Sequence, residues 1–271
     1  MAAGRLILIE GMIGVGKSTT ASKLANWLIS QGEDARVYHE FADDHPIRTK
    51  AIDLLRTHYR NMAAQSDDGE DGLARDAEVY GLDQWARLAS RCTGGQQTII
   101  LESTFLQNSV LPNLMDGAPI DEVKAVFARI ESQITAADPL LIYLRPSNID
   151  QALTRVHRER GESWASQNVA YVSKYPWARS RGLKGRQAVI ELYRAWEGLV
   201  DELLATSSCA TLLLVDPQDD WEAASRESIL QCVRECAGSF SRDGMLWSPH
   251  EIPVNLPEVE HEGPRSKRGD R

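Results

Sequence analysis

Residues 11–18 constrain this chain more than any other segment, because they read Gly-Met-Ile-Gly-Val-Gly-Lys-Ser and fit the pattern G-x-x-x-x-G-K-[ST]. The apolar run at residues 6–9, directly before them, is typical of a buried parallel strand. Apolar residues at helical spacing follow at residues 19–28. A glycine-rich loop between a buried strand and a helix N-terminus presents unpaired backbone N–H groups to phosphate. The sequence therefore predicts a P-loop that binds a nucleoside triphosphate.

Each position of this loop has an expected role. The predicted nucleotide-binding residues are Gly11, Gly14, Val15, Gly16, Lys17, Ser18 and Thr19. The glycines allow the backbone to approach the phosphates without Cβ clashes. Lys17 is expected to reach the β- and γ-phosphates, and the hydroxyl of Ser18 is expected to bind Mg²⁺. The predicted cofactors are ATP or GTP, together with Mg²⁺.

Composition limits the class of protein. The chain has 271 residues, of which 42% are hydrophobic, enough for one large α/β domain with a real core. A net charge of −9 argues against a nucleic-acid-binding surface. No apolar run approaches the ~18 residues of a membrane span, and the first strand begins too early for a signal peptide. We therefore expect a cytoplasmic protein that binds neither nucleic acid nor membrane, and the four cysteines are expected to be reduced thiols.

Hydrophobic periodicity predicts strands that alternate with helices. The expected strands are residues 6–9, 36–40, 98–101, 139–144 and 211–215, and the expected helices after the first are residues 46–64, 73–92, 120–136, 148–160, 184–205 and 221–236. This order implies a five-stranded parallel sheet with helices on both faces, whose ligands bind beyond the carboxyl ends of the strands. We expect a domain over residues 1–240 and a mobile, charged, Pro-rich tail over residues 241–271.

Two acidic residues are expected at that edge of the sheet. Glu40 ends the second predicted strand, and Glu102 follows the third. A carboxylate can take the proton of an alcohol acceptor in the transition state. An acceptor that already carries phosphate is repelled by a carboxylate and is better held by Arg.

The segment from residue 6 to about residue 215 resembles the nucleoside and nucleotide kinases of the P-loop superfamily, above all thymidylate kinases and deoxynucleoside kinases. The similarity lies in Leu-Ile-Glu-Gly at residues 8–11, in Asp-Pro-Leu-Leu-Ile-Tyr-Leu-Arg at residues 138–145 and in Thr-Arg-Val-His-Arg-Glu-Arg at residues 154–160. It implies a P-loop NTPase fold with an Arg-rich lid, which we place at about residues 154–186.

The resemblance also implies roles for single residues. Glu102 would orient Mg²⁺, directly or through water, and Glu40 would act as the general base toward a hydroxyl. Arg155 and Arg158 share a helical face and would neutralise the migrating phosphoryl group, with Arg160 as a third candidate.

Two arginines of the related families are missing. Deoxynucleoside and thymidylate kinases carry an Arg after the acid at the end of the third strand, where this chain has Ser103. Thymidylate kinases carry another before the acid that matches Glu40, where this chain has His39. Because both would contact an acceptor or transferring phosphate, their absence favours an alcohol acceptor.

The acceptor pocket is expected on the helix at residues 73–92. Tyr80, Gln84 and Trp85 occupy the stretch where nucleoside kinases contact the base, although aromatic residues at helical spacing also fit a plain core. The predicted function is a kinase that transfers the γ-phosphoryl group of ATP or GTP to a hydroxyl of a nucleoside-like small molecule. A thymidylate-type nucleoside monophosphate kinase, a phosphotransferase that inactivates a nucleoside antibiotic, and an NTP-binding switch remain alternatives, and a homodimer stays open.

Overall fold

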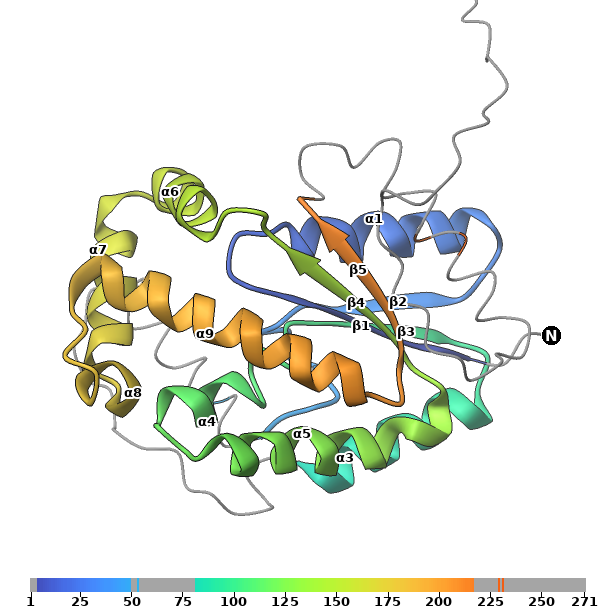
Figure 1. Ribbon diagram of the computed structural model, residues 1–271. Coiled ribbons are helices and arrows are strands. Elements are labelled where there is room, and N and C mark those ends of the chain that lie inside the picture. The colour runs from blue at the N-terminus through green and yellow to red at the C-terminus, as the bar shows by residue number, and fades with distance from the viewer. Residues whose placement is uncertain (1–3, 50–52, 54–80, 217–228, 230, 232–271) are drawn as a thin grey trace, which may run out of the picture.

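One parallel sheet forms the centre of the protein in the computed structural model, which describes residues 4–49, 53, 81–216, 229 and 231 (Figure 1). Its strands are β1 (Leu6–Gly11), β2 (Ala35–Tyr38), β3 (Thr98–Glu102), β4 (Leu140–Arg145) and β5 (Ala210–Val215). They lie in the order β2-β3-β1-β4-β5, and every neighbouring pair is parallel. The predicted α/β class and five-stranded parallel sheet are confirmed.

The burial of the strands explains their sequences. β1 lies at the centre of the sheet, with Ile7 opposite Ile100 of β3 on one side and Leu140 of β4 on the other. Every residue of β1 is buried, because helices cover both faces of a parallel sheet. β2 pairs with β3 alone and is half-exposed, and its last paired residue is Tyr38. The predicted second strand therefore ends before His39 and Glu40, which lie in the turn beyond the sheet.

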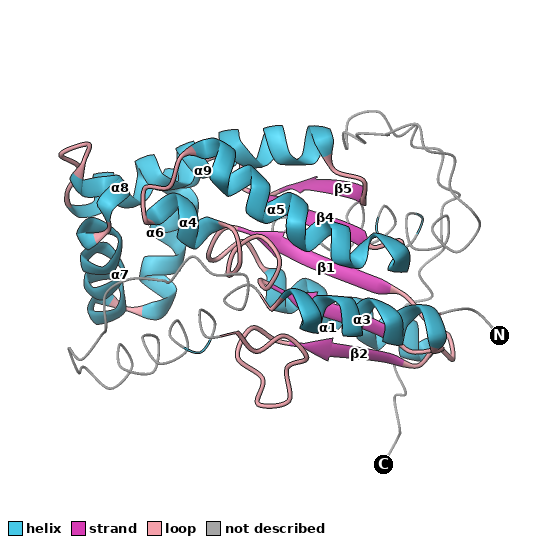
Figure 2. Cartoon of the chain, turned by 90° about the horizontal axis from the view of Figure 1, so that it is seen from below, coloured by secondary structure: helices cyan, strands magenta, loops and turns pink. Residues whose placement is uncertain are grey.

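Helices cover both faces of the sheet. They are α1 (Lys17–Ser30), α3 (Leu82–Gly94), α4 (Leu111–Met115), α5 (Ile120–Ile134), α6 (Ile149–Arg160), α7 (Glu162–Lys174), α8 (Pro176–Arg179) and α9 (Gly185–Thr206). Figure 1 shows α1 on one face and α3 and α5 on the other. In Figures 1 and 2, α6, α7 and α8 gather beyond the end toward which the strands point. This arrangement places three helices over the carboxyl edge, where the predicted site lies.

The structure corrects several predicted element bounds. Residues 46–49 are not helical, and the remainder of the helix predicted at residues 46–64 lies outside the described residues except for residue 53. The helix predicted from residue 73 is seen from Leu82, after Gly81, whose φ of 60° is left-handed. The predicted tail, and the last predicted helix apart from residues 229 and 231, also lie outside the described part.

Three helices of the structure were not predicted from the sequence. The long connection after α6 holds the helices α7 and α8, and α4 follows the turn after β3, none of which the sequence pattern had indicated. Among the helices of the described residues, none combines the length and apolar character needed to cross a membrane.

Candidate active site

The P-loop has the backbone that its glycines predict. Gly16 caps the N-terminus of α1 with a left-handed φ of 91°. Gly11 has a φ of 144°, and a Cβ there would lie 2.3 Å from the carbonyl oxygen of Leu144 in β4. A side chain at Gly11 would thus clash with the neighbouring strand, and one at Gly16 would strain the turn into the helix. The loop is therefore held against β4 by positions that only glycine fits.

Lys17 and Ser18 begin α1 at the end of this loop. The side chain of Lys17 is buried, and its Nζ donates a 2.8 Å hydrogen bond to the carbonyl oxygen of Met12. Burial lowers the pKa of Lys17, while the carboxylates of Glu40 and Glu102 act to raise it. Ser18 and Thr19 are exposed at the helix N-terminus, and Val15 is buried beneath the loop. Lys17 thus provides a positive charge at the point where the loop meets two acidic residues.

Glu102 joins three elements of the site. Its Oε1 accepts a 2.7 Å hydrogen bond from the hydroxyl of Ser18, and its Oε2 lies 2.7 Å from Nδ1 of His39. Within the described residues, no group of three or more His, Cys, Asp or Glu side chains gathers as a metal site. Mg²⁺ that is bound to a substrate phosphate needs only one or two oxygen ligands from the protein. The hydroxyl of Ser18 beside the carboxylate of Glu102 is such a pair. The residues present therefore fit Mg²⁺ brought by a nucleotide.

Glu40 has an unusual carboxyl group. Its pKa is raised to about 7, chiefly by burial and also by the charge of Glu102, against the lowering effects of Lys17, a hydrogen bond from Asn108, and Arg160. Nε2 of Gln107 lies 3.5 Å from Oε1 of Glu40. A carboxyl group that titrates near neutral pH can accept a proton efficiently from a bound hydroxyl. Its environment therefore suits the general-base role predicted for Glu40.

Helix α6 brings one arginine to this cluster. A Cβ added at Gly14 of the P-loop would lie 2.8 Å from Val156, so this face of α6 covers the loop. Arg160 follows Val156 by four residues and therefore lies on the same face of the helix. Its positive charge lowers the pKa of both Lys17 and Glu40. Its guanidinium group lies 4.7 Å from the ring centre of Trp164. Arg160 is thus the α6 arginine that the structure places at the site.

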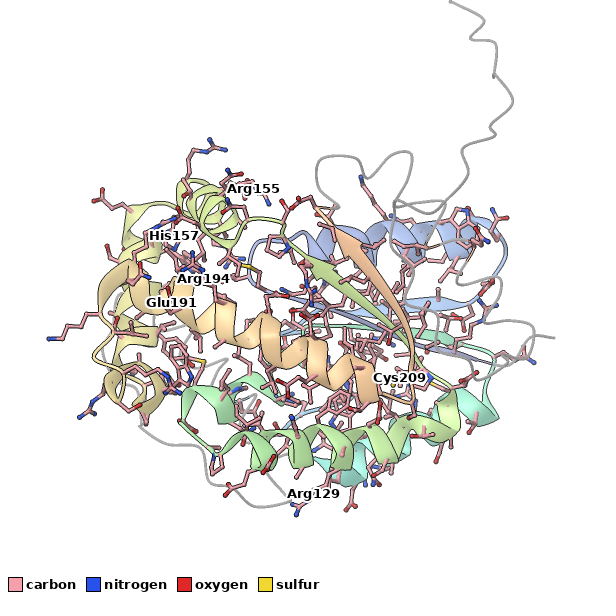
Figure 3. All side chains as sticks on the ribbon, in the orientation of Figure 1. Arg129, Arg155, His157, Glu191, Arg194 and Cys209 are labelled. Carbon is pink, nitrogen blue, oxygen red and sulfur yellow. The ribbon has the colours of Figure 1, made fainter. Side chains whose placement is uncertain are left out.

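Arg155 and Arg158 lie elsewhere around the helix. A residue two positions before Arg160 is rotated by roughly 200° around an α-helix, so Arg158 lies on nearly the opposite face. Arg155, labelled in Figure 3, is half-buried, and Arg158 is exposed. The charges that most affect the pKa of Lys17 and Glu40 include Arg160 but neither of these two.

The residues predicted for base recognition have other partners. Tyr80 lies outside the described residues. Trp85 is fully buried and packs edge-on against Phe105, which fits the core interpretation of that helix. The side-chain amide of Gln84 binds both the N–H and the carbonyl group of Arg48. Gln84 therefore holds the backbone before the undescribed segment.

Other residues of the site went unnoticed in the sequence. Glu10 is fully buried in β1, and its carboxylate accepts the backbone N–H groups of Phe105 at 2.7 Å and Gln107 at 3.0 Å. Tyr193 of α9 is buried against the P-loop, where the N–H of Ile13 hydrogen-bonds to its oxygen. An acid inside an apolar strand was a usable signal for Glu10. Tyr193 fits the apolar pattern of its helix and gave none.

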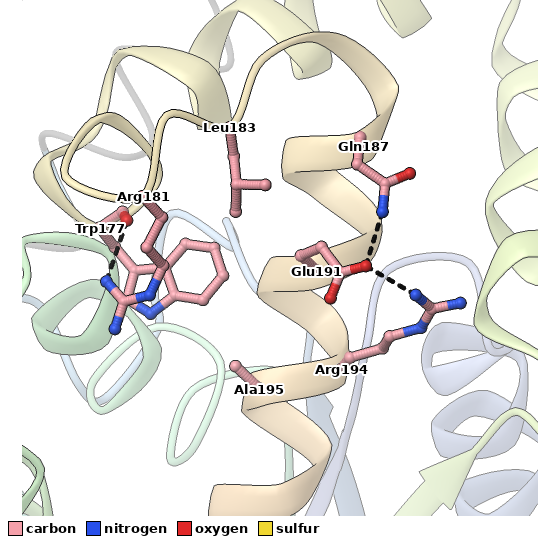
Figure 4. A pocket seen from close by; sticks show the side chains of 7 residues that line it. All are labelled: Trp177, Arg181, Leu183, Gln187, Glu191, Arg194 and Ala195. Carbon is pink, nitrogen blue, oxygen red and sulfur yellow. Dashed lines mark hydrogen bonds and ion pairs between the residues drawn. The ribbon is translucent and has the colours of Figure 1, made fainter.

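A separate hollow lies on the outer side of α9, between it and α8. Its volume is about 560 Å³, and Figure 4 shows the lining residues Trp177, Arg181, Leu183, Gln187, Glu191, Arg194 and Ala195. Glu191 binds Gln187 and Arg194 at 2.6 Å each, and Arg181 stacks 4.5 Å from the centre of Trp177. Glu191 and Arg194 contact each other and Arg181 contacts Trp177, and the hollow contains none of the P-loop or acidic residues of the candidate site.

Comparison with known proteins finds likeness in fold alone. No family model and no curated protein matches this sequence. Thymidylate kinase from Candida albicans is 15% identical, with a TM-score of 0.46 over 88% of this chain and 95% of its own. The YGR205w protein is 13% identical, with a TM-score of 0.38 over 79% of this chain and 86% of its own. The APS kinase CysC of Mycobacterium tuberculosis is 15% identical, with a TM-score of 0.27 over 59% of this chain and all of its own.

Proposed function

We propose that this chain is a Mg²⁺-dependent kinase that transfers the γ-phosphoryl group of ATP or GTP to a hydroxyl of a nucleoside or nucleoside-like compound. The observation that carries the proposal is the environment of Glu40. Its carboxyl group, with a pKa of about 7, shares one electrostatic cluster with Lys17 of the P-loop and Arg160 of α6. A base, a phosphate-binding lysine and a second cation at one place are the groups that phosphoryl transfer to an alcohol requires.

In the proposed reaction, the acceptor oxygen forms a bond to the γ-phosphorus as the bond to the β,γ-bridging oxygen breaks, and ADP or GDP leaves. The carboxylate of Glu40 takes the proton of the acceptor hydroxyl. Lys17 and Arg160 stabilise the charge on the transferring group. Bound Mg²⁺, held by Ser18 and, directly or through water, by Glu102, would neutralise further phosphate charge.

The charges near Glu40 favour an alcohol over a phosphate acceptor. His39 and Ser103 stand where related kinases carry arginines, and His39 is engaged with Glu102. Arg48 donates to the carbonyl oxygen of Asp43 at 2.9 Å and lies 3.5 Å from the carboxylate of Asp53. A phosphate acceptor brings about −1.5 to −2 charges, which would lie close to Glu40 and Glu102.

A transfer screen tests the proposal. Purified protein with ATP or GTP and Mg²⁺ would be incubated with nucleosides, their 5′-monophosphates and nucleoside antibiotics, and the products identified by mass spectrometry. We expect transfer to at least one compound without phosphate, and its loss in the Lys17→Met variant, whose side chain keeps a similar length without the charge. A kcat/KM for a monophosphate well above that of every unphosphorylated compound would support the thymidylate-type alternative instead. Nucleotide hydrolysis without transfer to any compound would support the switch.

A further inference from the structure

A narrow stripe of apolar residues packs helix α6 against its neighbours. The helix contacts chiefly α7 and α9, and its buried residues are Ala152, Leu153 and Val156. Arg160, at its last position, lies near Glu40 and Lys17 only in the present orientation of this helix. A helix that buries little apolar surface is readily displaced unless other contacts fix it. The polar contacts of α6 therefore bear directly on where Arg160 lies.

Arg186, in the first turn of α9, binds one side of α6. Its Nε and Nη2 donate to Oδ1 of Asp150 at 3.1 and 2.6 Å, and its Nη2 also lies 2.9 Å from the carbonyl oxygen of that residue. The hydroxyl oxygen of Thr154 lies 2.7 Å from the same Nη2, and Nδ1 of His157 lies 3.3 Å from Nη1. These α6 residues recur at intervals of four and three positions, so they share one face. One guanidinium group thus spans about two turns of α6.

The ring of His157 extends this set of contacts to α7. A guanidinium group can only donate, so Nδ1 of His157 accepts from Arg186 and carries no proton. Burial and the charge of Arg186 lower the pKa of His157, which favours the neutral ring, while a hydrogen bond with Asn168 of α7 acts to raise it. The ring packs edge-on against Trp164, and the guanidinium group of Arg160 lies over the same indole. Arg186 is therefore linked to Arg160 through His157 and Trp164.

The place of Arg186 is explained by α6 and not by its own helix. A cation in the first turn of a helix is repelled by the positive end of the helix dipole, whereas Asp150 lies in the first turn of α6, where an acid is favoured. Helix α9 is fixed to the core by buried residues from Ala188 to Leu203. An exposed ion pair by itself contributes little, but several directed bonds from one planar group fix orientation as well as distance. Arg186 thus joins a firmly packed helix to a loosely packed one.

We propose that Arg186 is a positioning residue for phosphoryl transfer, which holds α6 in the orientation that brings Arg160 over the P-loop. Arg160 follows His157 by three residues, so it lies next to the face that Arg186 binds. A rotation of α6 that broke the contacts with Asp150 would carry Arg160 away from Glu40. A displacement of about 1 Å at a reacting group can lower a rate about 100-fold. The inference rests on the proposed function, in which Arg160 stabilises the transferring phosphoryl group.

Steady-state kinetics of Arg186 variants test this role. Arg186→Met keeps a long side chain without the donors, and we expect kcat to fall about 10- to 100-fold with little change in the KM of either substrate. Arg186→Lys should recover only part of the loss, because one ammonium group cannot reproduce the planar fork that reaches Asp150 and His157 together. No loss of kcat in Arg186→Met would overturn the proposal.

Arg194→Met is the matched control. Arg194 also lies on α9, but its guanidinium group is paired with Glu191 of the same helix at 2.6 Å. Removing its charge therefore breaks no contact between helices, and kcat should stay close to that of the wild type. A fall in Arg194→Met as large as that in Arg186→Met would show a general effect of charge on α9 and would overturn the assignment to Arg186.

A double-mutant cycle distinguishes positioning from a general structural role. In a protein that already carries Arg160→Met, Arg186→Met should lower kcat by less than about twofold, because the group that Arg186 positions is gone. The same 10- to 100-fold fall in both backgrounds would show that Arg186 acts independently of Arg160, and the positioning role would be wrong.

Hydrogen exchange separates failure of this inference from failure of the proposed function. In the nucleotide-free protein, the amides of residues 149–160 should exchange faster in Arg186→Met than in the wild type or in Arg194→Met, because α6 has lost contacts that keep it closed. Unchanged exchange would overturn the proposal, whatever the kinetics. Faster exchange in a protein that transfers phosphate to none of the compounds screened would overturn the proposed function, and with it the role of Arg186 in transfer, while the attachment of α6 to α9 would stand.

Discussion

The hydroxyl of Ser18 donates a 2.7 Å hydrogen bond to the carboxylate of Glu102, a residue 84 positions further along the chain. The bond joins the start of α1 to the end of β3. Because β1 lies between β3 and β4, the P-loop that follows β1 necessarily lies beside the carboxyl end of β3. The pairing of Ser18 with Glu102, the two residues that we propose hold Mg²⁺, is thus a consequence of strand order.

This relationship predicts weaker Mg²⁺ binding when Glu102 is changed. Glu102→Gln keeps size but removes the negative charge, so the Mg²⁺ concentration for half-maximal activity should rise about 10- to 100-fold. Glu131 offers a matched control, since its Oε1 accepts a 2.5 Å hydrogen bond from the hydroxyl of Ser207 in the connection between α9 and β5. Glu131→Gln should leave the Mg²⁺ titration unchanged. Equal titrations for all three proteins would argue against a metal-binding role of Glu102.

The raised pKa of Glu40 predicts how activity depends on pH. A general base works only when deprotonated, so kcat/KM should be low under acidic conditions and rise with pH around the pKa of about 7. Glu40→Gln should lower kcat by roughly 10²–10⁴-fold and should lose this rise. The measurement is a pH profile of kcat/KM from pH 5 to 9 for both proteins. A wild-type profile that is flat between pH 6 and 8 would contradict the base assignment, as would a variant that loses only acceptor affinity.

The sequence was sufficient for the sheet and the P-loop because both depend on local patterns. Apolar runs mark the buried strands, and the loop glycines are required by a backbone that no other residue adopts without strain. The bounds were less secure at β2, since an edge strand ends where its pairing with its single neighbour ends. The predicted strand at residues 36–40 was two residues too long, because Tyr38 is the last residue that pairs with β3.

The surroundings of Glu40 depend on contacts between distant parts of the chain, which no local sequence pattern encodes. Gln107 follows β3 in an unremarkable polar stretch, and it lies 3.5 Å from Glu40 in a loop whose backbone is bound by Glu10, almost a hundred residues earlier. The arginines at residues 155, 158 and 160 show the same limit. Spacing within residues 154–160 identifies shared helical faces, but the closeness of Val156 to Gly14 decides which face lies over the P-loop.

That contact predicts unequal effects within the arginine cluster of α6. Arg160→Met should lower kcat by roughly 10²–10³-fold, because a charge directed at the transferring group is lost. Arg158→Met removes an equally exposed arginine from the opposite face and should leave kcat close to that of the wild type. Steady-state kinetics of both variants at saturating ATP provide the comparison. A large loss in Arg158→Met with a normal Arg160→Met would restore the assignment expected from the sequence and place the other face of α6 over the site.

Gly161, between α6 and α7, should be the costlier of two exposed glycines to replace. Its φ is 88°, and nothing lies within 4 Å of a Cβ added there, so only the backbone conformation opposes a side chain. Gly161→Ala should therefore lower the free energy of unfolding by about 1–2 kcal/mol. Gly198 has the same open surroundings inside α9 but no left-handed φ, and Gly198→Ala should raise it by roughly 0.5–1 kcal/mol because alanine favours a helix. Urea denaturation of the two variants measures both changes. Opposite signs would establish the strained turn that carries Arg160 at the end of α6, whereas a stabilising Gly161→Ala would show that this turn relaxes and does not fix the arginine over the P-loop.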